Sequence, residues 1–471
     1  MSIREPRELW QSPRRGSVLI IVLWVAFGLV ALALYFAASM GLELRAADQR
    51  VAGIQAELAI QGAMLHVSNL LARVEMPGWP PDLFPQDCED VPVGEARFWL
   101  LGRSDATYWG DTPAFGLVDE ASKLNLNTAT REMLERLTNL VLYPEVAAAI
   151  VDWRDSDSEP EVNGAEDQVY LRLNPPYRCK NAPFETVEEL RMVYGVTLEL
   201  LYGEDANLNG ILDPNENDGD TTPPRDNRDG RLQPGLWEYV TVFSRESGLN
   251  RTNVNDTQSL AQLLQSQFGA ERANQILSRI SLGPGPGGPA GPGGGGAPVL
   301  FTNLMEFYVR SGMTAEEFDQ VYPWLTTTNG VVEGLVNVNT APEPVLACIP
   351  GIDTDGAAAL VAYRLSRQNP RASLAWVVEV LGQERALQAG PWLTARSSVY
   401  SADVVALGRQ DRGYRRVRMV FDANDGVPVV RFRQDLTHLG WALGTRIRQE
   451  LDQMRESRAR TDAARSWGIM P

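Results

Sequence analysis

The chain has 471 residues and a formal net charge of −17, from 43 basic and 60 acidic side chains. This length is too great for one ordinary domain and is enough for two or three with cores of their own. The acidic balance argues against sequence-independent binding of nucleic acid, which needs a basic face. The only histidines, His66 and His438, lie near no candidate partner, which argues against a histidine-based triad or zinc site.

Residues 18–38 form an apolar stretch without a charge or a proline. At about 1.5 Å per residue, the stretch crosses a hydrocarbon core of about 30 Å. Arginines precede it at positions 4, 7, 14 and 15, so the positive-inside rule places residues 1–16 in the cytoplasm and the rest outside. The alternative is a cleaved secretory signal ending near Ser39, although such signals usually have apolar regions of only about 7–15 residues.

The helical pattern continues beyond this membrane segment. Val51, Ile54, Leu58 and Leu65 recur at helical spacing, and the pattern runs unbroken to Pro77. The sequence therefore predicts one helix of about 55–60 residues, apolar first and amphipathic later, that stands clear of the bilayer. An anchor with a coiled-coil stalk is the alternative, but the stripe is too short and too mixed for sustained heptads.

The leader ends in Arg14-Arg15-Gly16, and with the helix that follows it resembles a type IV pilin or a type II secretion pseudopilin. The resemblance implies that prepilin peptidase cuts between Gly16 and Ser17, an atypical first mature residue, and that the new amino terminus is methylated. Most members carry Glu at the fifth mature position, where this chain has Ile21. One subfamily shares that departure: general secretion pathway protein K, the large minor pseudopilin, whose missing Glu is explained by a place at the filament tip.

Three similar segments follow one another in the middle of the chain. Each opens with an Asn-x-Asn motif, within residues 124–129, 252–256 and 336–341. Two helical runs follow each motif, and a third helix starts near Phe184, Phe301 or Ser373. We interpret the Asn and Thr side chains as N-caps of the first helix. The Gly/Pro-rich residues 283–297 are predicted to be a flexible linker.

The repeated unit resembles the helix-hairpin-helix repeat of DNA-uptake proteins, in which glycine amides of the hairpin face phosphate. Only the third copy keeps such a hairpin, Ile349-Pro350-Gly351-Ile352, and no copy is flanked by Lys or Arg clusters. Because an acidic surround repels a phosphate backbone, structural reuse is the preferred interpretation. The same repeats occur in the inserted helical domain of protein K, so both resemblances converge.

Acidic side chains are concentrated in one block: residues 152–229 hold 19 Asp and Glu against 7 Arg and Lys. Within it, residues 205–216 match the spacing of a twelve-residue calcium loop, with a turn-forming glycine at the sixth position. The predicted ligands are Asp205, Asn207, Asn209, Ile211 through its carbonyl, Asp213 and Glu216. The alternative is a solvated turn rich in Asn and Asp. Pro214 and residues 217–219 prevent a continuous exiting helix, which predicts an isolated structural loop.

Two other oxygen-rich loops are candidate sites. A second calcium site is possible at Asp218, Asp220, Asp226 and Asp229. The upstream loop holds Asp155, Asp157, Glu159, Asn163, Glu166 and Asp167. Either loop could equally be solvated surface, although crowded bare charges repel one another. The resemblance to protein K also implies calcium in the inserted domain.

The three cysteines do not form a disulfide framework. Cys348 lies in an apolar run and is interpreted as a small core residue. Cys88 and Cys179 lie in polar loops and could pair in an oxidising compartment, or remain free thiols.

Strands are predicted on both sides of the repeats, at residues 96–101, 115–118, 399–407, 415–421 and 427–433, with a hairpin at 422–426. The predicted fold is α+β: a long N-terminal transmembrane and amphipathic helix, and a pilin-like α/β domain with a large inserted all-α domain of helix-hairpin-helix-like repeats. The predicted divisions are residues 1–16 (leader), 17–76 (helix), 77–122 (first pilin-like part), 123–395 (insert), 396–436 (returning strands) and 437–471 (C-terminal helix or tail).

The resemblance implies a non-enzymatic minor pseudopilin of a type II secretion system that helps initiate or cap the pseudopilus. Its expected partners are other minor pseudopilins and the major pseudopilin through the N-terminal helix, the inner membrane and prepilin peptidase, with the bulk of the chain in the periplasm. No nucleic-acid partner is expected. The alternative function is a membrane-anchored helix-hairpin-helix DNA receptor for uptake.

Overall fold

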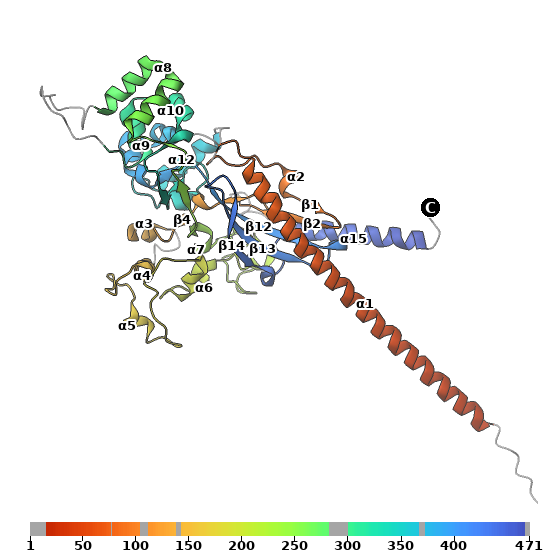
Figure 1. Ribbon diagram of the computed structural model, residues 1–471. Helices are drawn as coiled ribbons and strands as arrows, with labels where there is room; N and C mark the ends of the chain where they lie inside the picture. Colours follow the sequence, from red (N-terminus) through yellow and green to blue (C-terminus); the bar gives the residue numbers. More distant parts are fainter. Residues whose placement is uncertain are drawn as a thin grey trace, which may run out of the picture.

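The computed structural model describes residues 16–76, 78–103, 112–137, 143–281, 300–366 and 373–466. Helix α1, Gly16–Ala72, is 57 residues long, within the predicted range, and projects from the rest of the molecule (Figure 1). The leader before Gly16, the helix breaker Pro77 and the Gly/Pro-rich linker lie outside the described residues.

An antiparallel sheet forms the centre of the molecule. Its strands β1 (Val91–Val93), β2 (Ala96–Leu101), β12 (Val399–Leu407), β13 (Arg415–Asp422) and β14 (Val429–Asp435) lie side by side in that order, and the short β3 (Val118–Asp119) also pairs with β12. Strands β2 and β12 are direct neighbours, with Leu100 opposite Val404, although nearly the whole middle of the chain separates them in sequence. That middle part is therefore an insertion into the sheet.

The two faces of the sheet bury different elements. Alternate residues of β2, β12 and β13, among them Phe98, Val404 and Met419, pack against α1. On the opposite face, Trp99 and Val405 pack against Leu443 and other residues around helix α15, Gly444–Ser466. The central strands are covered on both sides, which explains why every residue of β12 is buried.

Helix α1 contacts the sheet through small side chains. Its buried face is mainly alanine (Ala52, Ala56, Ala59, Ala63), followed by Val67 and Leu71. The stripe noted in the sequence lies on the other side: Val51, Ile54, Leu58 and Leu65 are between 43% and 66% exposed. The amphipathic half of α1 thus has one apolar face on its own sheet and a second, larger-residue face turned outward.

The close approach of α1 to the sheet depends on two glycines at the β12–β13 turn. A Cβ on Gly408 would lie 2.1 Å from the carbonyl oxygen of Ala52, and a Cβ on Gly413 would lie 2.3 Å from its carbonyl carbon. Gly413 also has a φ of +71°, which favours glycine. These positions let the turn lie directly on the backbone of α1.

The insert contains three two-stranded parallel pairs, each opened by one Asn-x-Asn motif. They are β4 (Leu124–Asn125) with β5 (Val240–Thr241), β7 (Thr252–Asn253) with β8 (Leu325–Thr326), and β10 (Val336–Asn337) with β11 (Leu393–Thr394). In each motif the first Asn accepts a hydrogen bond from the backbone amide of the second, at 2.9 to 3.0 Å. The N-cap interpretation is wrong for these asparagines, because they close turns; Thr130 and Asp256 cap the helices that follow.

The helices of the insert fall into three groups by sequence, one after each motif. The first has α3 (Arg131–Arg136), α4 (Pro144–Arg154), α5 (Asp167–Tyr170), η3 (Val187–Met192), α6 (Leu198–Tyr202), η4 (Pro214–Glu216) and α7 (Leu236–Tyr239). The second has α8 (Thr257–Ser281, kinked at Gly269), α9 (Leu304–Ser311) and α10 (Ala315–Val321). The third has α11 (Glu343–Leu346), α12 (Thr354–Ser366), α13 (Ala375–Leu381) and α14 (Gln383–Ala389). In Figure 1, α3 to α7 lie apart from α8, α9, α10 and α12, which lie together. An antiparallel pair of β6 (Arg245–Ser247) with β9 (Val331–Glu333), far apart in sequence, also belongs to the insert.

Several predicted boundaries differ from the structure. The strand predicted at 115–118 is an isolated bridge from Phe115 to Leu101 followed by β3. The last strand begins at Val429, two residues later than predicted, because the hairpin includes Gly426 at a φ of +80°. Helix α1 ends at Ala72, before the helix breaker at which the sequence pattern stops.

Candidate cation sites

The predicted calcium loop closes on itself through its own side chains. Asp205 accepts hydrogen bonds from the amides of Asn209 (3.0 Å) and Gly210 (2.8 Å), and Gly210 has the positive φ, +71°, of a sharp turn. Glu216 accepts from the amides of Ala206 and Asp213, each at 3.0 Å, and so joins the two ends of the loop. The first and twelfth positions are thereby fixed relative to each other.

The middle of the loop converges on Asp213. The side-chain nitrogens of Asn207 and Asn209 donate to the same oxygen, Oδ2 of Asp213, at 2.7 and 2.9 Å. The Oδ1 atoms of these asparagines accept from amides further along the loop. Side chains at the third, fifth and ninth positions therefore meet, as the calcium-loop pattern requires. The side chain of Ile211 is buried, and its predicted role concerns only its carbonyl.

The carboxylates of this loop are crowded and removed from water. Asp205 and Glu216 are only 2% and 1% exposed, and Asp213 is also buried. Desolvation raises the pKa of Asp205, with an opposing contribution from Arg103. Desolvation also raises the pKa of Glu216, and the charge of Asp205 raises it further. Buried like charges of this kind are stabilised by a bound cation, so the residues present fit a hard divalent ion such as Ca²⁺.

In and beside the upstream acidic loop, several buried oxygen atoms have no hydrogen-bond partner within the part of the chain that the structure describes. They are Asp155 Oδ1, both carboxylate oxygens of Glu166 and Asn181 Oδ1. Glu166 is 2% exposed, and desolvation followed by the charges of Asp152 and Asp155 raises its pKa. Unsatisfied buried oxygens are costly, and this set has the ligand chemistry of a hard cation. Here too the residues fit the ion.

The geometry of this second cluster depends on a glycine. Asp152, on α4, accepts hydrogen bonds from the amides of Glu161 (2.9 Å) and Ala165 (2.5 Å). A Cβ on Gly164 would lie 1.9 Å from Asp152 Oδ2, so only glycine lets the loop lie over this carboxylate. The sequence pattern of the loop points to Asp155 and Glu166 but not to Asp152 or Asn181, because α4 supplies Asp152 and a segment beyond the loop supplies Asn181.

The side chains of these candidate sites are of mixed type. Among the described residues, no group of three or more His, Cys, Asp or Glu side chains is arranged to hold a metal by those side chains alone. Both clusters also use asparagine oxygens, which are ordinary ligands of calcium. The case for a cation therefore rests on buried oxygens of mixed type.

The possible site at residues 218–229 is organised differently. Asp226 accepts from the amides of Asp218 and Gly219, and Asp218 accepts from Thr222. Asp229 accepts from Asn227 and Gln233, and the exposed Asp220 pairs with Arg225 at 3.6 Å. These four carboxylates serve local turns, and no unpartnered buried oxygen among the described atoms marks a site there.

The cysteines are free thiols, so the pairing left open by the sequence is not formed. Cys88 is buried between α1 and the sheet, whereas Cys179 is buried in the core of the insert. The two lie in separate cores, which explains why they do not meet. Cys348 is fully buried, and its interpretation as a core residue is confirmed.

Among the described residues, α1 is the one helix long and apolar enough to cross a membrane. Its large apolar side chains from Leu19 to Leu44 are exposed, as expected for a segment with no partner in its own chain. Gly16 and Ser17, the predicted cleavage site, are the first residues of this helix, and the arginines of the leader lie outside the described residues.

Gly351, the hairpin glycine of the third repeat, is not accessible to a DNA phosphate. A Cβ on Gly351 would lie 2.7 Å from the backbone oxygen of Arg385 and 2.8 Å from Cβ of Gln388, both on α14. The Gly351 carbonyl also accepts from Nε of Arg385 at 3.0 Å. The loop is therefore packed against its own domain.

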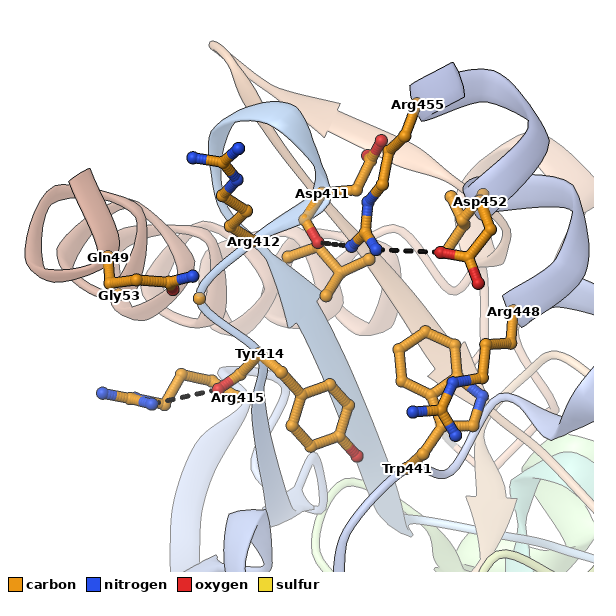
Figure 2. Close-up of a pocket in the computed structure, with 13 residues that line it drawn as sticks. Gln49, Gly53, Asp411, Arg412, Tyr414, Arg415, Trp441, Arg448, Asp452 and Arg455 are labelled. Carbon is orange, nitrogen blue, oxygen red and sulfur yellow. Dashed lines mark hydrogen bonds and ion pairs between the residues drawn. The ribbon is translucent and has the colours of Figure 1, made fainter. Parts of the chain in front are cut away.

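A cavity of about 670 Å³ lies between α1, the β12–β13 turn and α15 (Figure 2). Arg455 pairs with Asp452 at 3.0 Å and donates to the carbonyl of Asp411. The guanidinium of Arg448 lies 5.6 Å from the ring centroid of Trp441. Arg455 thus attaches α15 to the β12–β13 turn, and we assign no ligand to this cavity.

Comparison with known proteins points to one family. Residues 116–202 match the family model described as type II secretion system (T2SS), protein K. The chain is 29% identical over 209 residues to the type II secretion system protein K of Pectobacterium carotovorum subsp. carotovorum, covering 40% of this chain and 61% of that protein. It is 43% identical over 56 residues to that of Klebsiella pneumoniae, covering 12% of this chain and 17% of that protein. The matched regions thus span less than two thirds of these relatives.

The solved structures give a weaker likeness. One chain from the crystal structure of the GspK-GspI-GspJ complex of enterotoxigenic Escherichia coli has a TM-score of 0.36 and 11% sequence identity, over 87% of this chain and 98% of that chain. A score this low carries no argument about fold or partners.

Proposed function

We propose that this chain, which belongs to the type II secretion system protein K family, is a minor pseudopilin that helps initiate or cap a pseudopilus. In this proposal it has no catalytic role. Residues from Leu19 onward anchor it in the inner membrane, and the sheet and insert lie in the periplasm. The agreement of the family match at residues 116–202 with the form of α1 supports the proposal.

The observation that carries the proposal is the outward apolar surface of α1. Its membrane half is apolar all round, and the apolar surface continues as Ile54, Leu58 and Leu65 where the opposite face is already packed on the sheet. A helix that packs one face on its own chain and exposes a second, apolar face is suited to pack against the helices of other subunits. We propose that the other minor pseudopilins and the major pseudopilin are these partners.

Cleavage by prepilin peptidase between Gly16 and Ser17 tests this proposal. Mass spectrometry of the full-length protein purified from membranes of its own organism should give a chain that begins at Ser17. Gly16→Leu should block the cut, because a bulky side chain replaces the small residue before the scissile bond, while Met40→Leu should leave it intact. An intact Met1, or a chain beginning near Ser39, would contradict the proposal.

We further propose that the insert holds Ca²⁺ at two places: the 205–216 loop and the cluster of Asp155, Glu166 and Asn181. Support comes from the buried carboxylates of the loop and from the unpartnered oxygens of the cluster. The ion would neutralise crowded carboxylates and hold distant parts of the insert together. The protein side chains would bind and orient it.

Calorimetry of the full-length chain in detergent should then detect about two bound ions per chain, with dissociation constants of about 10⁻⁶ to 10⁻³ M. Glu216→Gln and Glu166→Gln should each remove one ion, because each loses the charge of a buried carboxylate. Asp220→Asn is the matched control, since Asp220 is exposed and paired outward. Unchanged stoichiometry in both Gln variants, or no binding to the wild type, would overturn the calcium proposal.

A further inference from the structure

Backbone carbonyls of the 205–216 loop accept hydrogen bonds from arginines outside the loop. Arg416 on β13, fully buried, donates from Nη1 to the carbonyl of Asn207 at 2.5 Å and from Nη2 to that of Leu208 at 2.7 Å. Arg103, which follows β2, donates to the same Leu208 carbonyl at 3.0 Å. Two guanidinium groups next to the central sheet therefore hold adjacent carbonyls of a loop that belongs to the insert.

The same loop also contacts the start of the C-terminal helix. The side-chain nitrogen of Asn207 donates to the carbonyl of Trp441 at 3.2 Å. Trp441 and Leu443 directly precede α15, and Leu443 packs together with Ile447 and Leu451 of α15 on the face of the sheet opposite α1. One short loop thus joins three parts that are far apart in sequence: the insert, the sheet and α15.

The arginines and a bound ion would use different oxygens. In a loop of this spacing, the ligands are the side chains at positions one, three, five, nine and twelve and the carbonyl at position seven. The carbonyls that Arg416 and Arg103 hold belong to the third and fourth positions, so these arginines do not compete for ligand atoms. Leu208 has a φ of +57°, unusual for leucine, and its side chain is buried in the core of the insert.

From these contacts we infer that cation binding in the 205–216 loop fastens the insert to the central sheet through Arg416 and Arg103, and to the start of α15 through Asn207. The inference rests on the proposed calcium loop and adds what the ion controls. With an ion, the loop keeps the wrapped form that presents the Asn207 and Leu208 carbonyls. Without a bound ion, repulsion among Asp205, Asp213 and Glu216 opens the loop and moves the Asn207 and Leu208 carbonyls away from the arginines.

The consequence for Arg416 is direct. It would keep only its pairing with Asp403, at 2.9 and 2.5 Å, and two of its buried donor contacts would be lost. Charge-assisted hydrogen bonds in a buried site are among the stronger ones, so their loss loosens the junction. Because coupling between two equilibria is reciprocal, docking of the sheet must in turn strengthen cation binding by the loop.

Hydrogen exchange on the full-length chain in lipid nanodiscs tests this inference, with and without Ca²⁺. Removing Ca²⁺ should speed amide exchange at least tenfold in residues 203–216, and also in residues 415–422 and 441–451. In Glu216→Gln, exchange in all three segments should no longer depend on Ca²⁺. In the double variant Asp403→Asn with Arg416→Gln, which removes both buried charges together, the loop should still respond to Ca²⁺, as should residues 441–451 through Asn207, whereas residues 415–422 should not.

The control is Arg431→Gln, a half-exposed residue of β14 that pairs with Asp422 and does not contact the loop; it should behave as the wild type. If the loop responds to Ca²⁺ while 415–422 and 441–451 do not, the fastening inference is wrong and the calcium proposal stands. If the loop itself does not respond, the calcium proposal for this loop is wrong. If the sheet still responds in Glu216→Gln, the other cation site is responsible and the inference is overturned.

Discussion

Replacing Glu120 with Gln should lower the free energy of unfolding by about 3–5 kcal/mol, the usual cost of removing one partner from a buried ion pair. Glu120 is fully buried where the insert begins, and its Oε1 lies 3.0 Å from Nη2 of Arg418 on β13. Thr241 donates to its other oxygen. The pair joins the start of the insert to the sheet, so the variant weakens that junction.

The cost is large because of what the variant leaves behind. Arg418 and Lys123 are both buried, with their cationic groups 4.4 and 5.1 Å from the ring centroid of Trp237. Without the Glu120 charge, these two cations remain in a site where desolvation disfavours them. Arg103 already pairs with the nearby Glu238, so that carboxylate does not fully compensate.

Denaturant unfolding of the full-length chain in detergent, read by tryptophan fluorescence, measures the effect. Arg433→Gln is the matched control: its pair with Glu57, at 2.8 Å, is about half exposed on both sides and should cost less than about 1 kcal/mol. The double variant Glu120→Leu with Arg418→Met should recover much of the loss, because it leaves no unpaired buried charge of this pair. Equal effects of Glu120→Gln and Arg433→Gln would show that the buried pair does not stabilise the junction.

Much of the fold could be predicted from local patterns. Strands β2 and β12 have the predicted bounds because alternation and β-branched side chains mark them clearly. The length of α1 followed from uninterrupted helical residues. Its packing did not, because large apolar residues such as Leu58 dominate the pattern while the buried face is built from alanines. Only the proximity of the β12–β13 turn to Ala52 explains that choice of small side chains.

Of the two candidate cation sites, one could be predicted from the sequence and the other could not. The 205–216 ligands could be identified together because they lie within one short loop. The second cluster could not, since Asn181 and Asp152 reach Glu166 from separate segments that only the tertiary fold brings together. The role of Arg416 was equally hidden. In the sequence it is one of several arginines in a strand, and only the folded sheet, in which it lies opposite Val405 and bonds the side chain of Asp403, places it next to the loop.

Substitutions on the outward apolar face of α1, which includes Ile54 and Leu58, should have the second large effect, a loss of secretion. Ile54→Asp with Leu58→Asp should reduce secretion of type II substrates at least tenfold, because a carboxylate forced into an apolar helix interface costs several kcal/mol. Both positions are more than half exposed in the single chain, so the variant should still fold and reach the membrane. Ile54→Leu with Leu58→Met, which changes the same two positions but keeps both side chains apolar, is the matched control.

The most direct test of the central claim is therefore to measure these substrates in the culture medium of the organism that carries this chain, after deletion of its gene. Deletion should abolish secretion, and the wild-type chain and the control Ile54→Leu with Leu58→Met should restore it. Ile54→Asp with Leu58→Asp should not restore it, although immunoblots show equal amounts in the membrane. Unchanged secretion after deletion would contradict the assignment as a minor pseudopilin, and full restoration by the double variant would contradict packing through α1.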